Sequence, residues 1–358
     1  MLAAVLKESG ADLTFAQVTT TPPAQDEVLV RTVAAGVCHT DLSVIRGHRR
    51  VPMPCVPGHE AAGVVEAVGE DVDHLRPGDH VVACLSVFCG ACRWCVAGKP
   101  ALCDQQRVKR AAGSGSRLML DGEPLGAFGQ IGAFAEQLLV HRNALVKIDP
   151  AVPLEAAAVL GCAVVTGLGA VFHTARVTPG ETVAVLGCGG VGLNCIQGAR
   201  LAGAGQIIAI DRDPDKLELA RSFGATATLV ADADIVERTL DLSAGGVDHA
   251  FEAVGMPETV TLSFAILARG GTSTVVGALP TDTRVELPGA DLALGKTLRG
   301  CRMGSNRFQL DIPNYLDLYA QGRLRLDELV SVRMPFDRLS EALTPPAGTA
   351  RVVLTFAP

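Results

Sequence analysis

The chain has 358 residues, of which 48% are hydrophobic and 19% are charged, and its net charge is −7. This length suits two domains with sizeable buried cores, and the composition excludes an intrinsically disordered protein. The acidic balance argues against a nucleic-acid-binding surface. Lys7 and Glu8 interrupt the apolar start, and no apolar stretch reaches membrane-spanning length, so we expect a cytoplasmic protein without a signal peptide.

The first 150 residues carry short apolar runs separated by turn residues, as in EVLVRTVAAGV, EAAGVVEAVG and PGDHVVAC. Pro-Gly and Gly-Glu/Asp punctuation between such runs is typical of an antiparallel, barrel-like β domain. Residues 111–130, AAGSGSRLMLDGEPLGAFGQ, are interpreted as a long surface loop.

Four cysteines cluster in the stretch CGACRWCVAGKPALC, residues 89–103. A chain of this size with eleven cysteines, an odd number, is not typical of a disulfide-bonded protein. Four thiolates this close together can surround one tetrahedral Zn²⁺ and leave no position for a substrate. The stretch therefore predicts a structural zinc site that stabilises its own lobe, with a redox CxxC pair as the weaker alternative. The predicted ligands are Cys89, Cys92, Cys95 and Cys103.

The sequence changes character after residue 150. Residues 153–175, PLEAAAVLGCAVVTGLGAVFHTA, are alanine-rich and helical in pattern. From Thr182 onward, strand patterns alternate with amphipathic helices, which indicates βαβ units on a parallel sheet. The stretch TSTVVGA near the end of this region would leave an exposed sheet edge, so we expect a second copy of the chain to cover it in a homodimer or a homotetramer.

The first strand of the βαβ region, in TVAVLGCGGVG, leads into a G-x-G-x-x-G turn that opens a helix. Such glycines permit a tight turn and close approach of the backbone to a pyrophosphate at the positive end of the helix. Asp211 ends the next strand, where a carboxylate binds the ribose hydroxyls and repels a 2′-phosphate. The pattern predicts an NAD site, although Arg212 can soften the preference over NADP. The predicted turn residues are Gly187, Gly189, Gly190, Val191 and Gly192.

Three further residues are candidates for a second metal site. GVCHTD contains Cys38, PGHE contains His59, and LGCAVVTG contains Cys162. Two thiolates and one imidazole would leave the fourth tetrahedral position open to water or substrate. A single cysteine in an apolar stretch is more often a small buried hydrophobe, and spacing alone does not assemble this set. The remaining cysteines are assigned to that buried class: Cys55, Cys84, Cys188, Cys195 and Cys301.

Taken together, these stretches resemble the zinc-dependent medium-chain alcohol dehydrogenases over essentially the whole chain. The resemblance is carried by GVCHTDLSVIRG, PGHEAAGVVEAVG, CGACRWC with its later cysteine, GCAVVTGLGA, GCGGVG with its aspartate, and RVVLTF. The branch it resembles contains the classical alcohol dehydrogenases and the thiol-dependent formaldehyde dehydrogenases, and the bacterial, mycothiol-dependent type is nearest. The resemblance implies an α/β protein with a GroES-like, β-rich catalytic domain over residues 1–163, to which residues 300–358 return, and a Rossmann cofactor domain over residues 164–299.

The resemblance also implies roles in the catalytic domain. Glu60 matches an acid behind the metal, and Asp41 matches the carboxylate that orients the zinc histidine. Thr40 matches the hydroxyl that takes the proton of the alcohol. Where relatives carry a histidine that ends the proton relay this chain has Ser43, and His48 is an alternative that is otherwise a solvated loop residue. The implied ligands of the catalytic zinc are Cys38, His59 and Cys162.

Four further residues are implied to contact the cofactor, at its pyrophosphate, nicotinamide or ribose: His39, Thr166, Lys216 and Arg351. The implied reaction is the NAD-linked interconversion of a primary alcohol and its aldehyde, with one catalytic and one structural zinc per chain. The alternative is oxidation of a hydroxymethyl–thiol adduct of formaldehyde. That substrate requires cationic groups at the pocket mouth, and the candidates, unless they are merely solvated, are Arg107, Lys109, Arg110 and Arg117. A non-enzymatic NAD-binding protein of the same fold is disfavoured by the complete ligand set.

Overall fold

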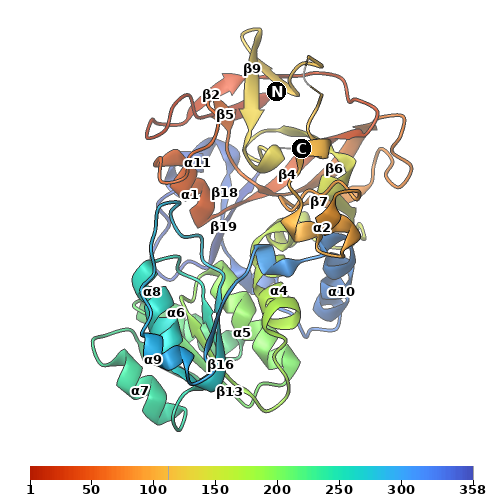
Figure 1. Cartoon of the computed structure of the whole chain (residues 1–358). Helices are drawn as coiled ribbons and strands as arrows, with labels where there is room; N and C mark the ends of the chain where they lie inside the picture. The colour runs from red at the N-terminus through yellow and green to blue at the C-terminus, as the bar shows by residue number, and fades with distance from the viewer. Residues whose placement is uncertain (112, 358) are drawn as a thin grey trace.

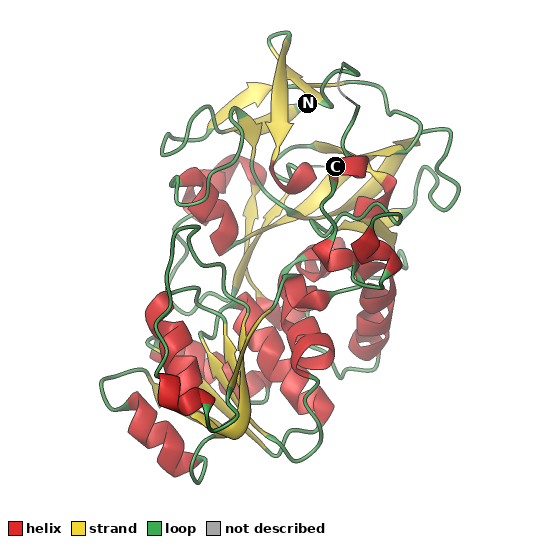
Figure 2. Ribbon diagram, viewed as in Figure 1, coloured by secondary structure: helices red, strands yellow, loops and turns green. Residues whose placement is uncertain are grey.

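The computed structural model describes residues 1–111 and 113–357, which form two lobes (Figure 1). The upper lobe in Figure 1 is built mainly from strands, and it contains both N-terminal segments in red and orange and C-terminal strands in blue. The lower lobe contains a sheet surrounded by helices (Figure 2). This mixed α/β architecture confirms the fold class expected from the sequence.

The upper lobe is organised around a seven-stranded sheet with the order β11-β7-β6-β4-β19-β18, in which β10 also pairs with β4. The long central strand β4 pairs antiparallel with both β6 and β19. Its last two strands come from the end of the chain, which places C-terminal residues in this lobe. The division of the chain at residues 163 and 299 stays a prediction. The strands are β4 (Glu27–Val37), β6 (Glu60–Val68), β7 (His80–Ala83), β10 (Gln137–His141), β11 (Leu145–Lys147), β18 (Val330–Pro335) and β19 (Arg351–Thr355).

The sequence predicts a long surface loop over residues 111–130. Residue 112 lies outside the described residues and 113–117 are loop, but the prediction is wrong for residues 118–127. Two strands of this segment form a hairpin, which joins two short strands in a four-stranded sheet. The turn is Asp121-Gly122, and both residues have positive φ, as a two-residue hairpin turn requires. Leu118 and Leu125 are buried in an apolar cluster under the hairpin. The strands of this sheet are β3 (Thr19–Thr20), β5 (Cys55–Val56), β8 (Leu118–Leu120) and β9 (Glu123–Ala127).

Two arginines of this region bind one buried carboxylate. Glu27 is fully buried, and its Oε1 accepts hydrogen bonds from Arg110 Nε at 2.9 Å and from Arg117 Nε at 2.7 Å. Burial raises the pKa of Glu27, but the hydrogen bonds from Arg110, from the backbone of Ala24 and from Arg117 lower it to about 2. These arginines are therefore neither solvated nor free to line a substrate pocket. Both interpretations offered by the sequence, solvated residues or cations at the pocket mouth, are wrong for Arg110 and Arg117.

Glu27→Gln is expected to lower the free energy of unfolding by about 2 to 3 kcal/mol at pH 7, because two part-buried guanidinium groups lose their counter-charge. The folded-state pKa of Glu27 is depressed from 4.5 to about 2, so its stabilisation is present above pH 4.5 and is lost as the pH falls toward 2. Urea denaturation of the wild type and of Glu27→Gln should show a smaller difference in free energy of unfolding at pH 4 than at pH 7. Glu123→Gln, an exposed change on the neighbouring hairpin, is the control. An equal difference in free energy of unfolding between wild type and Glu27→Gln at both pH values would contradict this account.

The lower lobe contains a six-stranded parallel sheet with the order β14-β13-β12-β15-β16-β17. Numbered along the sheet's own strands this is 3-2-1-4-5-6, the order of a Rossmann fold. Val183 and Val185 of the first strand pack in one apolar cluster, and Ala184 and Leu186 pack in another, so helices bury both faces. The strands are β12 (Thr182–Leu186), β13 (Gln206–Asp211), β14 (Ala227–Val230), β15 (Val247–Glu252), β16 (Leu267–Val275) and β17 (Thr297–Gly300).

The edge strands of this sheet are β14 and β17, and the stretch TSTVVGA is not at an edge. Residues 272–275 of that stretch belong to β16, which is paired with β15 on one side and β17 on the other. In the described part of the chain Thr297–Gly300 is therefore the outer strand. Its sequence, TLRG, follows Lys296 and is too short and polar to be recognised as a strand.

Helices fill the space between and around the two sheets. Among the described residues no single helix is long and apolar enough to cross a membrane; one pair, residues 154–161 with 163–175, passes by length and composition only when joined across a 53° bend. The helices are α1 (His39–Ile45), α2 (Arg93–Val96), α3 (Leu154–Ala158), α4 (Ala163–Gly169), α5 (Gly190–Ala202), α6 (Pro214–Phe223), α7 (Ile235–Leu242), α8 (Pro257–Ala265), α9 (Gly289–Leu292), α10 (Phe308–Ala320) and α11 (Leu339–Ala342).

Candidate metal and cofactor sites

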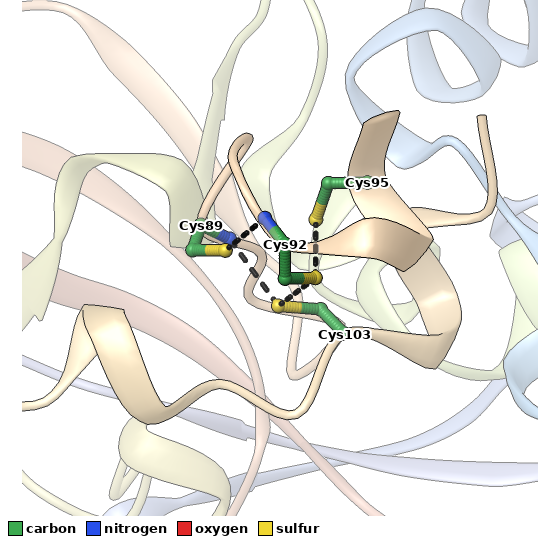
Figure 3. A group of neighbouring side chains, drawn as sticks. All are labelled: Cys89, Cys92, Cys95 and Cys103. Carbon is green, nitrogen blue, oxygen red and sulfur yellow. Dashed lines mark hydrogen bonds between the residues drawn. The ribbon is translucent and has the colours of Figure 1, made fainter. Parts of the chain in front are cut away.

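The four cysteines of residues 89–103 converge on one point, as Figure 3 shows. Their sulfur atoms all lie within 4.8 Å of one another. Cys92 Sγ lies 3.5 Å from Cys95 Sγ and 3.8 Å from Cys103 Sγ. Four sulfurs at the usual zinc distance around one tetrahedral ion are about 3.8 Å apart, so the residues fit a Zn²⁺. All eleven cysteines of the chain are free thiols.

Backbone N–H groups around this cluster favour the thiolate form. The N–H of Cys89 and that of Gln105 point at Cys103 Sγ, at 3.4 and 3.3 Å, and the N–H of Cys92 points at Cys89 Sγ. The hydrogen bond from the backbone of Cys95 contributes most to lowering the pKa of Cys92, to about 6. Burial, by contrast, raises the pKa of Cys95 to about 12 and also raises the pKa of Cys103. A thiolate is the form that binds metal, so Cys92 is the thiol of this cluster that is best prepared for an ion.

A second set of donors is fully buried between the lobes. The ligand atoms of Cys38, His59, Glu60 and Cys162 also lie within 4.8 Å of one another, and His59 Nε2 is 3.3 Å from Cys162 Sγ. Cys38 follows β4, His59 directly precedes the neighbouring strand β6, and Glu60 begins that strand, paired opposite Gly36. Cys162 comes from the turn before α4. Two thiols and an imidazole at these separations fit the coordination of a Zn²⁺ with one position left open.

Asp41 orients the imidazole of this set. Its Oδ1 lies 2.8 Å from His59 Nδ1, and its Oδ2 accepts the backbone N–H of Cys38 at 3.0 Å. Burial would lower the pKa of His59, but the charge and hydrogen bond of Asp41 raise it well above the ordinary value. The other ring nitrogen, Nε2, consequently faces Cys162, as a metal ligand must.

Glu60 lies behind the donors and contacts Arg351, with 2.9 Å between Oε1 and Nη2. Burial raises the pKa of Glu60 to about 7 although the charge of Arg351 lowers it. Space for this carboxylate exists only because residue 36 is glycine, since a Cβ there would lie 2.3 Å from Oε2. The guanidinium of Arg351 also packs closely against Gly190, since a Cβ at that position would lie only 3.0 Å from its Cζ. Arg351 therefore connects the donor set to the start of α5.

The glycine turn before α5 has the shape that a dinucleotide site needs. Gly187 has a φ of +90°, and a Cβ at Gly192 would lie 1.7 Å from the carbonyl oxygen of Gly187, so the fold itself requires both glycines. A Cβ at Gly189 would meet no protein atom within 4 Å. The open space at Gly189, at the N-terminus of a 13-residue helix, fits a pyrophosphate.

Asp211 lies beside this turn at the end of β13. Its Oδ2 accepts the backbone N–H of Cys188 at 2.7 Å, and its Oδ1 accepts that of Asp213 at 3.0 Å. Arg212 is exposed, and Lys216 is half-buried in the first turns of α6. The carboxylate is thus held by the backbone at the position where the sequence predicts a ribose contact.

The remaining predicted residues of the catalytic domain lie on α1 and in the loop after it. Thr40 is half-buried in the first turn of the helix, and His39 is exposed. The Ser43 hydroxyl donates to the carbonyl oxygen of His39 at 3.1 Å, so it is occupied along its own helix. His48 is exposed in the loop. In α4, by contrast, the hydroxyl of Thr166 is buried, 3.7 Å from Met303 Sδ.

Phe128 was not identified from the sequence, although it packs directly on the donor set. Its ring meets that of His59 edge to face, with 5.5 Å between centroids. The next residue, Gly129, has a φ of +61°, and a Cβ there would lie 3.3 Å from Leu85 Cβ and 3.6 Å from His59 Cβ. These three residues form a wall beside the imidazole. The only sequence signal for the turn at Gly129 is the pair of glycines in residues 126–130, GAFGQ.

Val254 was also missed, although it lies at the glycine turn. It is 40% exposed, and a Cβ at Gly187 would lie 2.7 Å from its Cγ2. Glu252 fixes the backbone here, because its Oε1 accepts the N–H groups of Val254 at 2.9 Å and of Gly255 at 2.6 Å. An acidic residue that ends a buried strand and is followed by Val-Gly is the sequence signal for such a turn.

A Rossmann sheet, an open glycine turn and a buried donor set beside it are the features of a metal-dependent dehydrogenase. Residues 24–150 match the family model for the alcohol dehydrogenase GroES-like domain, and residues 190–321 match that for zinc-binding dehydrogenases. The class-3 alcohol dehydrogenase of Myxine glutinosa is 37% identical over 349 residues, which cover 95% of this chain and 93% of the relative. An S-(hydroxymethyl)glutathione dehydrogenase of Escherichia coli is 36% identical over 349 residues, 95% of each chain.

Solved structures agree over the whole chain. A zinc-binding-domain alcohol dehydrogenase from Burkholderia ambifaria matches with a TM-score of 0.93 and 37% identity, covering 100% of this chain and 99% of that one. Benzyl alcohol dehydrogenase from Acinetobacter calcoaceticus matches with a TM-score of 0.92 and 34% identity, covering 99% of each chain. A zinc-binding dehydrogenase from Sinorhizobium meliloti bound to NADP matches with a TM-score of 0.82 and 30% identity, covering 99% of this chain and 98% of that one.

The chain therefore belongs to the zinc-dependent medium-chain alcohol dehydrogenase family, in the branch that includes the formaldehyde dehydrogenases. It is an enzyme, an alcohol–aldehyde oxidoreductase, as the resemblance implied.

Proposed function

We propose that this enzyme oxidises primary alcohols to aldehydes, and catalyses the reverse reduction, with NAD and with two zinc ions per chain. The observation that carries the proposal is the buried set of Cys38, His59 and Cys162, oriented by Asp41 and joined to the glycine turn through Arg351. The thiol cluster of residues 89–103 holds the structural ion.

A Zn²⁺ bound to the buried set supplies Lewis-acid polarisation of the alcohol oxygen, and NAD supplies the hydride acceptor. The side chains of the protein do the rest. Asp41 keeps His59 in the ligand orientation, and the hydroxyl of Thr40 takes the proton of the alcohol. Arg351 and the open turn at Gly189 hold the pyrophosphate. Ser43 donates to its own helix, so the proton passes from Thr40 to water.

A free alcohol is favoured over a hydroxymethyl–thiol adduct. Arg110 and Arg117, two of the four cations that the sequence offered for a bulky thiol, are bound to Glu27. Arg107 and Lys109 are exposed and remain candidates. The adduct stays the second candidate function because several relatives are named S-(hydroxymethyl)glutathione dehydrogenases.

The deciding experiment is a substrate screen on zinc-replete enzyme. NADH formation is measured with benzyl, cinnamyl and straight-chain alcohols, and with formaldehyde in the presence and absence of glutathione or mycothiol. Turnover of free alcohols without any thiol supports the proposal. Strict thiol dependence would reverse the ranking, and inactivity with every alcohol, aldehyde and adduct would reject it.

Cofactor choice is expected to depend on Asp211. Wild-type enzyme should prefer NAD by kcat/KM, because the carboxylate beside the turn repels a 2′-phosphate. Asp211→Gly should bring the two cofactors to within about tenfold of each other, since it removes that single charge. Arg212→Gln is the control and should keep the NAD preference. Steady-state kinetics with both cofactors decides the matter, and a wild-type preference for NADP would contradict it.

The enzyme is further expected to be a homodimer, or a tetramer of dimers, paired through β17. Among the described strands Thr297–Gly300 pairs only with β16, so its outer side can continue the sheet in a second copy. Light scattering at micromolar concentration should report at least twice the mass of the chain. Replacing Leu298 with proline removes a backbone N–H and disturbs the regular strand edge, so it should shift the protein toward monomer. A monomeric wild type would refute the expectation.

A further inference from the structure

The loop after α1 contains three arginines within five residues, in the stretch RGHRR. The chain as a whole has a net charge of −7, whereas this loop carries three positive charges and no acidic residue. Arg46, Arg49 and Arg50 are all exposed, as is His48 between them. Eight arginines of the chain pair with carboxylates, whereas within residues 1–111 and 113–357 no ion pair involves these three. The arginine loop, residues 46–50, thus presents three positive charges that no described carboxylate contacts within 4.0 Å.

The arginine loop lies beside the catalytic donor set. The guanidinium of Arg49 lies over the ring of Phe128, 5.9 Å from its centroid, and that ring packs edge to face on His59. The loop is also fixed to α1, because the N–H of Arg49 donates to the carbonyl oxygen of Ser43 at 3.0 Å. One aromatic ring therefore separates an exposed cation from a buried metal-site imidazole.

Phe128 holds this arrangement in place. It is 7% exposed and belongs to an apolar cluster with Val44 and Ile45 of α1, against which Val51 and Met53 also pack. Both ends of the arginine loop are thus anchored to the cluster that supports the imidazole. The backbone that carries the charged side chains is therefore held in place next to the donor set.

We propose that the arginine loop is an anion-recognition site at the mouth of the catalytic site, and that the preferred substrate is an alcohol or aldehyde that carries a carboxylate. This inference rests on the proposed function. A guanidinium binds a carboxylate through two parallel hydrogen bonds, and stacking on Phe128 restricts Arg49 to the side of the site. Uncompensated cations at a cleft also raise the association rate of anionic substrates.

The carboxylate can belong to the alcohol itself or to a thiol carrier. Three benzyl alcohols of similar shape separate charge from shape: 4-(hydroxymethyl)benzoate, 4-(hydroxymethyl)benzamide and 4-(aminomethyl)benzyl alcohol. S-(hydroxymethyl)glutathione, formed from formaldehyde and glutathione, provides the second source of carboxylate. The wild type should show its highest kcat/KM with the benzoate and its lowest with the ammonium compound. Raising the salt to about 0.5 M should narrow that range, because the Debye length shortens.

The variants test whether these arginines create the preference. Arg49→Gln should lower kcat/KM for the benzoate about threefold, and the triple change of Arg46, Arg49 and Arg50 to Gln about tenfold, with the benzamide unchanged within about twofold. Arg49→Lys retains the charge and should retain most of the preference. Arg269→Gln, at an exposed arginine of the cofactor sheet, is the matched control and should change nothing.

Calorimetric binding of 4-(hydroxymethyl)benzoate without NAD provides a readout that is independent of turnover, and it should weaken in the triple variant. A preference for the glutathione adduct over the benzoate, lost in the triple variant, assigns the anion to the thiol carrier and supports the site. Equal kcat/KM for benzoate and benzamide at low salt, or a preference that survives the triple change, would overturn the inference. Oxidation of the neutral benzamide reports the proposed function separately, so the two failures are distinguishable.

Discussion

Cys162→Ala is expected to lower kcat at least about a thousandfold while leaving the protein folded, because the loss of one of three donors removes several kcal/mol of Lewis-acid stabilisation. The residue is 6% exposed, and a thiol replaced by a methyl costs about 1 kcal/mol of stability, so the melting temperature should fall only a few degrees. NADH formation, thermal melting and zinc content on one preparation measure all three quantities. The variant should retain the zinc of the thiol cluster.

Cys195→Ala is the matched control for this change. Cys195 is also a buried cysteine, but it lies in α5 outside both donor sets. It should keep kcat within about twofold of wild type and lose a similar, small amount of stability. Turnover that survives Cys162→Ala, or that is lost equally in Cys195→Ala, would show that the buried set is not the reaction centre.

Local patterns were sufficient to predict the cofactor turn and the thiol cluster. The cluster lies within residues 89–103, and the turn, its strand and its helix are contiguous in the chain, so spacing reflects geometry directly. Cys38, His59 and Cys162 differ in this respect. They come from the end of β4, the start of β6 and the turn before α4, and only the pairing of β4 with β6 brings the first two together. The family resemblance suggested that set, whereas the spacing of the residues did not.

Other features could not be predicted because they depend on contacts between distant segments. Glu27 looks like an ordinary strand residue until the hairpin brings two arginines onto it. The Asp121-Gly122 turn is the exception, because it is a local signal of a hairpin that the prediction of a long loop overlooked. The edge strand Thr297–Gly300 is strand only because β16 lies next to it. The arginine loop likewise becomes meaningful only through the contact of Arg49 with Phe128.

Loss of the proposed structural ion should lower stability rather than turnover, unlike loss of a proposed catalytic ligand. Cys103→Ser is expected to reduce the zinc content from two ions per chain to one and the free energy of unfolding by about 3 kcal/mol or more, since the ion stabilises the lobe only in the folded state. For a chain of this size, with an unfolding entropy of about 0.75 kcal/mol/K, that corresponds to a fall in melting temperature of roughly 4 °C. Cys103 Sγ accepts two backbone N–H groups and is 4% exposed, so the substitution disturbs a buried position of the loop as well as the metal site.

Turnover per folded molecule should survive Cys103→Ser, because the thiol cluster is closed and contacts neither His59 nor Cys162. Activity measured well below the melting transition, corrected for the folded fraction, should stay within about threefold of wild type, a change of less than 1 kcal/mol. Cys301→Ser is the control, since this half-buried thiol lies outside both sets and its contact with Thr174 can be made by a hydroxyl. If Cys103→Ser were instead stable, inactive and still bound to two zinc ions, the two donor sets would not have the separate structural and catalytic roles assigned to them.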